Sequence, residues 1–358
     1  MRRVYLIRHG KPELPGEGRF CVGRTDIPLC TLGGLQACLA GAFLEDKNIR
    51  MLFSSPLRRA QETARAMGMP YTVLSGLEEQ DMGAWDGLSF ERIRKSWPEL
   101  YARRGEDPML VPAGAERPEH CRERFGLAVG RALEQSEGDI AIVAHVTVLQ
   151  TFLCGLLELP LREYRGISIP YGSVTTLVYE NDSLKAETIG ASPVPPLTRA
   201  LCLRLLQTAD ACGRITDHCQ AVAEEALRIA GCLERHGIRL DRNLIEQGAL
   251  LHDIARATPG HARVGAQWLR ELGYGAAAAL TERHEELEFS RIDEAAVVFI
   301  ADKCIRETGW VSLEERFARS AEKCGNDDAV QAHGRKYRVA KKIQKAINTL
   351  CSEEVVGV

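Results

Sequence analysis

The pattern of apolar residues changes abruptly at a proline-rich stretch, residues 191–198, and this change restricts the chain to two separately folded parts. Before this stretch, short apolar runs alternate with longer segments of helical periodicity, and after it the sequence is almost wholly helical. A chain of 358 residues also exceeds what one ordinary hydrophobic core accommodates. We therefore expect domains at residues 1–190 and 199–358, joined by the linker 191–198.

The composition excludes several classes of protein. The apolar fraction of 45% and the charged fraction of 27% are those of a globular protein. A net charge of -3 argues against nucleic-acid binding driven by overall charge, and the apolar runs are too short to cross a membrane. Twelve cysteines without a Cys-x-x-Cys pair, and no evident signal peptide, favour reduced thiols in the cytoplasm. We therefore expect a cytoplasmic protein that binds neither nucleic acid nor membrane, and the oligomeric state stays open.

The first half alternates strands and helices. Helical patterns begin near Thr31, Pro56, Leu88, Pro118 and Val148, with that from Leu88 ending at Ser96, and a closing hairpin turns at Asn181-Asp182. The expected strands are Val4–Ile7, Met51–Ser55, Tyr71–Leu74 and Asp139–Ala144. This alternation predicts a three-layer α/β sandwich with a largely parallel sheet.

Two of these strands end in histidine, His9 and His145. One histidine at such a place would more often be a core or loop residue than a catalyst. Here Arg8 precedes His9, and Arg58-Arg59 lies at the start of a helix. Guanidinium groups and helix amino termini bind phosphate oxygens, and a neutral imidazole can attack a phosphoryl group. The pattern therefore indicates phosphoryl chemistry at the carboxyl edge of the sheet.

Four motifs carry a resemblance to a known family. Arg8-His9-Gly10, residues 54–64 (SSPLRRAQETA), residues 77–83 (LEEQDMG) and Val143-Ala144-His145 resemble the signatures of the histidine phosphatase superfamily, the phosphoglycerate-mutase-like enzymes. The resemblance covers about residues 1–190 and implies that His9 is the phosphorylated nucleophile. It implies a phosphate pocket of Arg8, Arg59 and His145, with Glu79 as the acid that protonates the leaving oxygen and then activates water. It implies no cofactor for this domain.

Other positions bear on the type of enzyme. The family usually has glycine after the second histidine, whereas this chain has Val146-Thr147, and residues 114–117 (GAER) replace the usual Gly-Gly-Glu-Ser. Arg103-Arg104 resembles the paired arginines of mutases, but the segment between Glu79 and His145 is short. Residues 20–29 look more like those of α-ribazole-phosphate phosphatases and their small-substrate relatives. We therefore expect a phosphatase that acts on a small phosphomonoester, with a phosphoglycerate-type mutase as the less favoured alternative.

In the second half, polar residues interrupt apolar helical faces. His218 lies on the same face as Val222, His252-Asp253 lies within an apolar run, and Asp302 ends the run from Val297. Burying an ionised carboxylate costs several kcal/mol unless it is paired or ligates a metal. His120, His236 and His333 lack such a context and are expected at the surface.

His218, His252, Asp253 and Asp302 resemble the His…His-Asp…Asp pattern of the HD superfamily of metal-dependent phosphohydrolases. The resemblance covers about residues 214–310 and implies an all-α helical bundle that holds a divalent metal. His261 and His284 look like the extra histidines of members that hold a second metal, or they contact the substrate phosphate. Imidazoles and carboxylates suit Mn, Fe, Co, Ni, Zn or Mg, and the sequence does not choose among them.

Two interpretations of the whole chain remain. In the first, the protein is a bifunctional phosphohydrolase, whose second domain hydrolyses a phosphate ester of a nucleotide-like substrate. In the second, the HD domain is a metal- and nucleotide-binding module that regulates the phosphatase. A purely structural bundle fits poorly with four polar residues on buried faces in the order of a known family.

Overall fold

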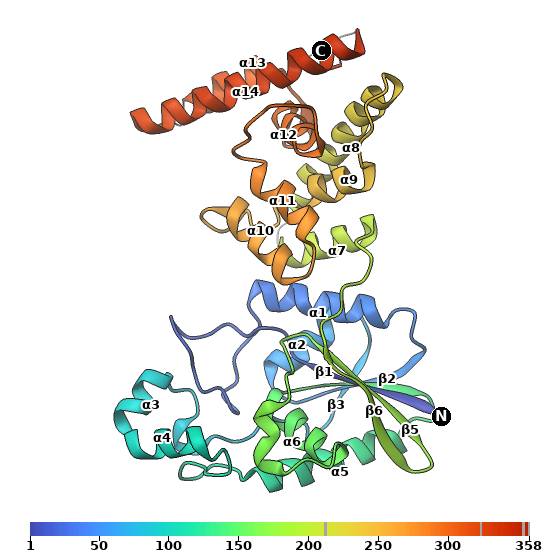
Figure 1. Cartoon of the computed structure of the whole chain (residues 1–358), viewed down its shortest axis with the longest axis vertical. Helices are drawn as coiled ribbons and strands as arrows, with labels where there is room; N and C mark the ends of the chain where they lie inside the picture. Colours follow the sequence, from blue (N-terminus) through green and yellow to red (C-terminus); the bar gives the residue numbers. More distant parts are fainter. Residues whose placement is uncertain (211–212, 323, 353–354, 357–358) are drawn as a thin grey trace. The chain divides into compact units, whose positions relative to one another are not determined.

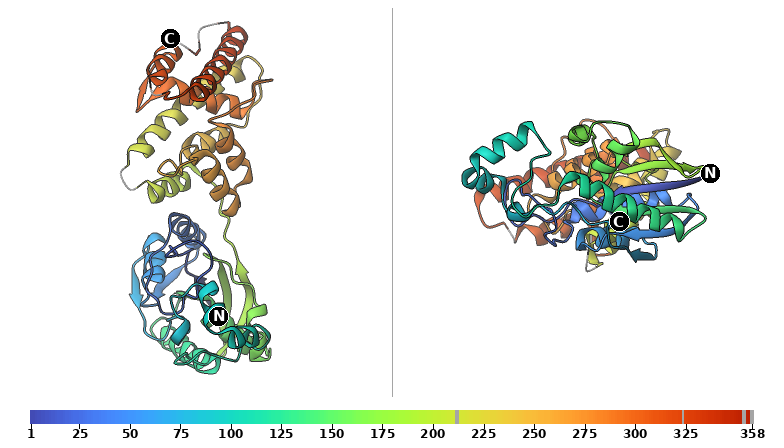
Figure 2. Two further views of the ribbon diagram at one scale, coloured as in Figure 1. Left: turned by 90° about the vertical axis from the view of Figure 1, so that its left-hand side faces the viewer. Right: turned by 90° about the horizontal axis from the view of Figure 1, so that it is seen from below.

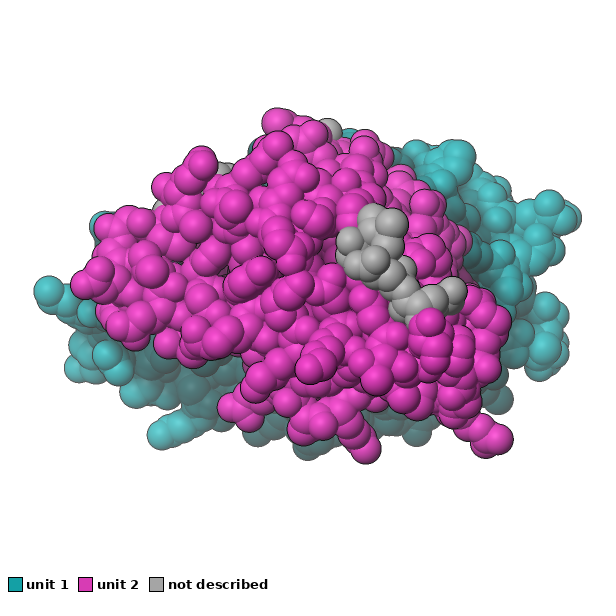
Figure 3. Space-filling model, turned by 90° about the horizontal axis from the view of Figure 1, so that it is seen from above, with its two compact units in different colours: residues 1–195 teal, residues 196–358 magenta. Residues whose placement is uncertain are grey.

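The computed structural model describes residues 1–210, 213–322, 324–352 and 355–356. The chain divides into two compact units, Met1–Pro195 and Pro196–Val358, which Figure 3 colours separately. Each unit has its own secondary structure and core, and each is described by itself.

The first unit is built on one six-stranded sheet of order β3-β2-β4-β1-β5-β6 (Figure 1). β3, β2, β4 and β1 are parallel, whereas β5 and β6 are antiparallel additions beside β1. The strands are β1 (Arg2–Arg8), β2 (Ile49–Ser54), β3 (Tyr71–Val73), β4 (Asp139–Ala144), β5 (Val174–Glu180) and β6 (Ser183–Ala191). The β5–β6 turn is at Asn181 and Asp182, both of which have positive φ, as a two-residue hairpin turn requires.

Helices cover both faces of this sheet, so the predicted three-layer α/β sandwich is confirmed (Figures 1 and 2). The period of two along β1 explains the layers, because Tyr5 and Ile7 face one core and Val4 and Leu6 face the other. The first core includes α1 (Thr31–Leu44) and α2 (Arg58–Ala66), and the second includes α5 (Pro118–Glu134) and α6 (Val146–Leu156).

A smaller helical layer forms between β3 and α5. The expected helix near residues 88–96 is found as α3 (Phe90–Ser96), but α4 (Pro98–Glu106) was not predicted. Pro98 disfavours helical backbone at Trp97 and occupies the first turn of the new helix, which separates α4 from α3. Trp85, in the 3₁₀ turn η1 (Gly83–Trp85), packs with Cys21, Met82 and Ile93 in a separate small core. η2 (Leu161–Gly166) is a second 3₁₀ turn, between α6 and β5.

The second unit is mostly helical, as predicted, with one short hairpin. Its helices are α7 (Arg199–Ala209), α8 (Arg214–Arg235), α9 (Arg242–Leu251), α10 (His261–Glu271), α11 (Gly275–Arg283), α12 (Glu294–Cys304), α13 (Leu313–Ala321) and α14 (Asp327–Cys351). The hairpin consists of β7 (Ile305–Arg306) and β8 (Gly309–Trp310). α8, α9 and α12 pack on one another, and α13 and α14 form a C-terminal pair against α12. Among the described helices, none is both long and apolar enough to span a membrane.

The buried face of α5 provides a test of the second core. Phe125 is fully buried against Phe152, with ring centroids 5.3 Å apart, whereas Leu127 on the same helix is 71% exposed. Phe125→Ala should lower the free energy of unfolding by about 3–5 kcal/mol, and Leu127→Ala should change it by no more than about 0.5 kcal/mol. Urea denaturation of the two variants measures the difference, and equal effects would contradict the packing described.

Candidate functional site

His9 follows β1 at the carboxyl end of a central strand. Its Nδ1 lies 2.7 Å from the carbonyl oxygen of Gly10 and donates to it, which leaves the lone pair on Nε2. Arg59 donates from its Nε to this Nε2 at 3.2 Å. The side chain is only 4% exposed. The unprotonated Nε2 of His9 is therefore buried and faces the guanidinium of Arg59, a group that binds anions.

His145 lies beside His9 because β1 and β4 are parallel and in register, with Arg8 opposite Ala144. The two rings have centroids 5.0 Å apart. Ser55, which follows β2, accepts from the backbone N–H of Leu57 and places its Oγ 2.8 Å from Nε2 of His145. Its hydroxyl can then donate to Nε2, so the ring proton sits on Nδ1. This Nδ1 is buried and has no hydrogen-bond partner among the described residues, so it can donate to a ligand.

Backbone carbonyl groups, rather than a carboxylate, hold Arg59 in place. Its two terminal nitrogens donate to the carbonyl oxygens of Thr25 at 2.8 Å and Gly23 at 2.7 Å. Asp86 holds that loop by accepting from the backbone N–H groups of residues 23–25. Because neutral carbonyls orient the guanidinium, its positive charge remains to be balanced by an anion.

Arg8 also lies close enough to His9 to affect its charge, and Tyr171 supports it there. The guanidinium carbon lies 3.7 Å from the centre of the Tyr171 ring, and one terminal nitrogen donates to the carbonyl oxygen of Ile169 at 2.7 Å. The Tyr171 ring is itself 5.6 Å from that of His9. Arg8 Nε is buried without a partner among the described residues, and it therefore offers another donor to an anion.

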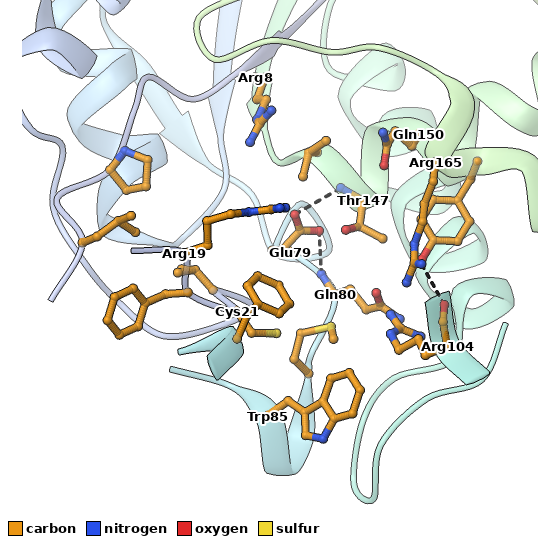
Figure 4. Close-up of a pocket in the computed structure, with 18 of the residues that line it drawn as sticks. Arg8, Arg19, Cys21, Glu79, Gln80, Trp85, Arg104, Thr147, Gln150 and Arg165 are labelled. Carbon is orange, nitrogen blue, oxygen red and sulfur yellow. Dashed lines mark hydrogen bonds between the residues drawn. The ribbon is translucent and has the colours of Figure 1, made fainter. Parts of the chain in front are cut away.

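Glu79 is held against the amino terminus of α6 by backbone donors (Figure 4). Its carboxylate accepts from the N–H groups of Thr147 at 3.1 Å and Val148 at 3.3 Å, and from that of Gln80 at 2.8 Å. Helix amino termini favour negative charge, so this site suits a carboxylate. The contacts use the backbone of Thr147, which explains why a residue other than glycine is accommodated there.

Burial lowers the pKa of His9 well below its ordinary value, and the positive charges of Arg59 and Arg8 lower it further. Burial also lowers the pKa of His145, with contributions from Arg59, His9 and Arg8. Both rings are therefore neutral near pH 7. The two arginines place positive charge beside these neutral rings, which favours the binding of a phosphate group.

These residues line one end of a cavity of about 690 Å³. Its outer walls combine apolar and aromatic residues, such as Trp85 and Cys21, with the arginines Arg19, Arg104 and Arg165 (Figure 4). Arg104 also reaches this cavity, but its guanidinium donates to the carbonyl oxygens of Pro108, at 3.0 Å, and Leu110. Arg103 is exposed and does not line the cavity. The adjacent pair Arg103-Arg104 therefore does not act as a two-pronged clamp in this arrangement.

In the second unit, the six residues singled out from the sequence form two adjacent groups of three. Within each group, the possible ligand atoms lie within 4.8 Å of one another. The first group is His218, His252 and Asp302, and the second is Asp253, His261 and His284. Asp302 Oδ1 is 3.3 Å from His218 Nε2, and Asp253 Oδ1 is 3.1 Å from His261 Nε2. The His252 and His284 rings join the groups, with centroids 5.1 Å apart.

Backbone carbonyls fix the orientation of three of these rings. Nδ1 of His218 donates to Glu307 at 2.9 Å, that of His252 to Ala249 at 2.7 Å, and that of His284 to Thr281 at 2.6 Å. For His252 and His284 the bond leaves the lone pair on Nε2, which faces the carboxylates. Nε2 of His218 lies 3.3 Å from Oδ1 of Asp302. Burial lowers the pKa of His218, but Asp302 outweighs this effect and raises it, so a metal would displace a proton from this ring. Such outer hydrogen bonds are the usual means of orienting metal-binding histidines.

The donor set fits a metal ion by its charges and its unpaired atoms. His252 Nε2 and Asp253 Oδ1 are buried without hydrogen-bond partners among the described residues, which is costly unless a ligand binds there. Burial lowers the pKa of His252 to about 4. Burial raises the pKa of Asp302, but Lys303 and His218 outweigh this effect and hold it well below its usual range. Neutral imidazoles and ionised carboxylates are the forms that ligate metals.

A cavity of about 720 Å³ extends from these groups to the C-terminal helices. α13 and α14 supply Phe317, His333 and Lys336 to its wall. His333 was expected at the surface, but it is half-buried, with its ring 5.2 Å from that of Phe317 and Nε2 2.7 Å from Ser320 Oγ. His120 and His236 are exposed, as predicted. Further cations line the cavity, and they include Arg214, Arg306 and Arg316.

Several residues of these sites were not found from the sequence. Tyr171 lies in a loop before β5, and the antiparallel pairing of β5 with β1 brings that loop to His9. Only this strand pairing could have indicated that Tyr171 lies near His9, because the residues around Tyr171 form no recognisable motif. The hydroxyl of Ser55 and the wall formed by α13 and α14 depend on packing that no short motif encodes.

The comparison with protein families agrees with this architecture. Residues 4–192 match the histidine phosphatase superfamily (branch 1), and residues 215–307 match the HD domain. The first match covers more than half of the chain, so the chain belongs to the histidine phosphatase superfamily, and it carries an HD domain after the phosphatase domain.

Individual relatives match about half of the chain each. An acid phosphatase of Mycobacterium tuberculosis is 30% identical over 198 residues, which are 54% of this chain and 94% of that protein. The bifunctional protein Rv2228c of the same species is 34% identical over 157 residues, 42% of this chain and only 43% of its own length. Among solved structures, a mycobacterial glucosyl-3-phosphoglycerate phosphatase is 27% identical, with a TM-score of 0.49, covering 54% of this chain and 100% of that chain.

The lowered pKa of His9 can be tested directly. The folded-state pKa lies below the ordinary value of 6.5, so the ring should stay neutral as the pH falls through about 6.5. In a chain labelled with nitrogen-15 histidine, the His9 signals, assigned with His9→Ala, should keep the shifts of a neutral ring through this range. The chain unfolded in urea provides the reference titration. Protonation of His9 at the ordinary midpoint would contradict its placement between two arginines.

Proposed function

We propose that the N-terminal domain hydrolyses a small phosphomonoester through a phosphohistidine intermediate on His9. The observation that carries this proposal is the buried, unprotonated Nε2 of His9 beside Arg59. Arg8, Arg59 and Nδ1 of His145 would hold the phosphate oxygens, because each presents a donor that no carboxylate neutralises.

In the proposed reaction, Nε2 of His9 attacks phosphorus while the bond to the ester oxygen breaks. Glu79, in its protonated form, gives its proton to the departing oxygen, so an alcohol leaves. Glu79 then accepts a proton from water, whose oxygen attacks the phosphorus and breaks the P–N bond. Phosphate leaves, and His9 and protonated Glu79 are restored. The backbone N–H groups of α6 keep Glu79 in one position for both steps.

A phosphatase is favoured over a phosphoglycerate-type mutase by the outer part of the cavity. A mutase needs groups that hold a second anionic portion of its substrate. Here Arg104 is occupied by backbone carbonyls, and the surrounding walls include Phe20, Trp85, Phe90 and Tyr101. Such walls suit an apolar or aromatic leaving group, which agrees with the resemblance of residues 20–29 to α-ribazole-phosphate phosphatases.

For the HD domain, we propose hydrolysis of a phosphate ester of a nucleotide-like substrate. His218, His252, Asp253 and Asp302 would hold a divalent metal, with His261 and His284 as ligands of a second metal or contacts of the substrate phosphate. A bound metal would supply an acidified water and polarise a phosphoryl oxygen. The cations of the cavity wall would bind phosphate groups, and Phe317 and His333 would offer ring surfaces to a base.

The alternative is that the HD domain binds a metal and a nucleotide without turnover and regulates the phosphatase. The same residues would then form a sensor site. Activity measurements on single-site variants distinguish the two proposals, since they assign each reaction to one domain.

His9→Ala should reduce phosphate release from an aryl phosphate by roughly 10³-fold or more, because the nucleophile is lost. Asp253→Ala and a chelator should leave this activity within about two-fold and abolish release from a nucleotide panel. A full-length chain with His9→Ala that keeps its aryl phosphatase activity would overturn the first proposal. If nucleotides are not hydrolysed but change the rate of the His9 reaction, the regulatory alternative is correct.

The part of the cavity wall that α13 and α14 form gives a separate test of the substrate class. Lys336→Ala should raise KM for a hydrolysed nucleotide by about ten-fold, the effect of losing one charge-assisted hydrogen bond, with little change in kcat. Lys345→Ala is the matched control, because Lys345 is exposed on the same helix and does not line the cavity. Equal KM values for the two variants would contradict a role of α14 in substrate binding.

A further inference from the structure

A third group of possible metal ligands lies outside both proposed active sites. Cys232 and His236 are one helical turn apart on α8, and Cys351 is the last residue of α14. Their three possible ligand atoms lie within 4.8 Å of one another. The sequence separates Cys351 from the other two by more than a hundred residues, so only the fold brings them together.

The surroundings suit a bound ion. Cys232 and Cys351 are 2% and 3% exposed, whereas His236 is at the surface. Nδ1 of His236 donates to the carbonyl oxygen of Cys232 at 3.0 Å, which leaves the lone pair on Nε2. A cavity of about 450 Å³ reaches Cys232. Three arginines line this cavity, Arg228, Arg235 and Arg242. Arg228 is paired with Glu225 and Arg242 with Glu234, so these two oppose a cation less strongly.

Hydrogen bonds hold the end of α14 in place beside α8. Ser352, next to Cys351, has a φ of 53°, so the chain turns back there. The carbonyl oxygen of Val355 then accepts from Arg228 of α8, and Oδ1 of Asn348 accepts from the N–H groups of Val355 and Val356. The position of Cys351 relative to α8 is therefore set by contacts other than those of its sulfur.

We propose that Cys232, His236 and Cys351 bind one borderline-soft transition-metal ion, with Zn²⁺ the expected occupant. Two thiolates and an imidazole are a usual zinc donor set, and their charges balance the ion. The exposed side of His236 leaves the fourth position to water. Neither HD group contains a sulfur ligand, so this site differs from them in chemistry. The ion links the C-terminal helix to the helix that carries His218.

Cobalt(II) substitution of the purified full-length chain tests this proposal, because thiolate ligands give a sulfur-to-cobalt charge-transfer band in the near ultraviolet. The wild-type chain should show this band at one equivalent. Cys232→Ser and Cys351→Ser should lose it, and His236→Ala should weaken cobalt binding by at least about ten-fold. His236 is exposed, so this last variant remains informative if the serine variants fail to fold.

Two control variants separate this site from the HD groups. Cys219→Ser removes a thiol 3.8 Å from Nδ1 of His252, and His252→Ala removes an HD ligand; both should keep the band. Removal of zinc should also lower the Tm of the wild-type chain more than that of Cys351→Ser. The proposal is overturned if the wild-type chain lacks the band, if either serine variant keeps it, or if mass spectrometry of protein purified with reductant finds Cys232 joined to Cys351 as a disulfide.

Discussion

The parallel pairing of β1 with β4 is the constraint on which the first site depends. It places Arg8 opposite Ala144, so the residues that follow, His9 and His145, meet across adjacent strands. The centroids of the two buried rings lie 5.0 Å apart, and the charges of Arg8 and Arg59 act on both rings. A register shift of one residue would send one of the two histidines to the opposite face of the sheet. Because β1 is apolar on both faces, its register is set by how its side chains pack in the two cores.

The HD unit reaches a comparable arrangement without a sheet. Its helices place neutral rings and ionised carboxylates together, and backbone carbonyls aim the rings inward. In both units the backbone orients the reactive side chains: Gly10 fixes His9, Gly23 and Thr25 fix Arg59, and the amino end of α6 fixes Glu79. Such partners depend on the path of the chain more than on side-chain identity, so they leave little trace in a motif.

The contrast between side-chain motifs and backbone contacts explains which features could be predicted from the sequence. The two fold classes followed from the periodicity of apolar residues, and the family motifs singled out His9 and the HD residues. The sequence did not reveal Tyr171, because its role arises from the pairing of β5 with β1. It also did not reveal α4, whose start depends on Pro98, or the inward position of His333, which depends on how α14 packs against α13. Residues that act through long-range packing need the tertiary structure.

The contact between Glu79 and α6 has a consequence for how enzymes of this kind diversify. The carboxylate is anchored by main-chain N–H groups, which every residue except proline possesses. Substitutions at residues 146 and 147 can therefore reshape the cavity wall beside Glu79 while the carboxylate stays where it is. The side chains at these positions shape the cavity wall, and the backbone N–H groups hold Glu79. Selection can therefore change the range of substrates without loss of the reaction chemistry.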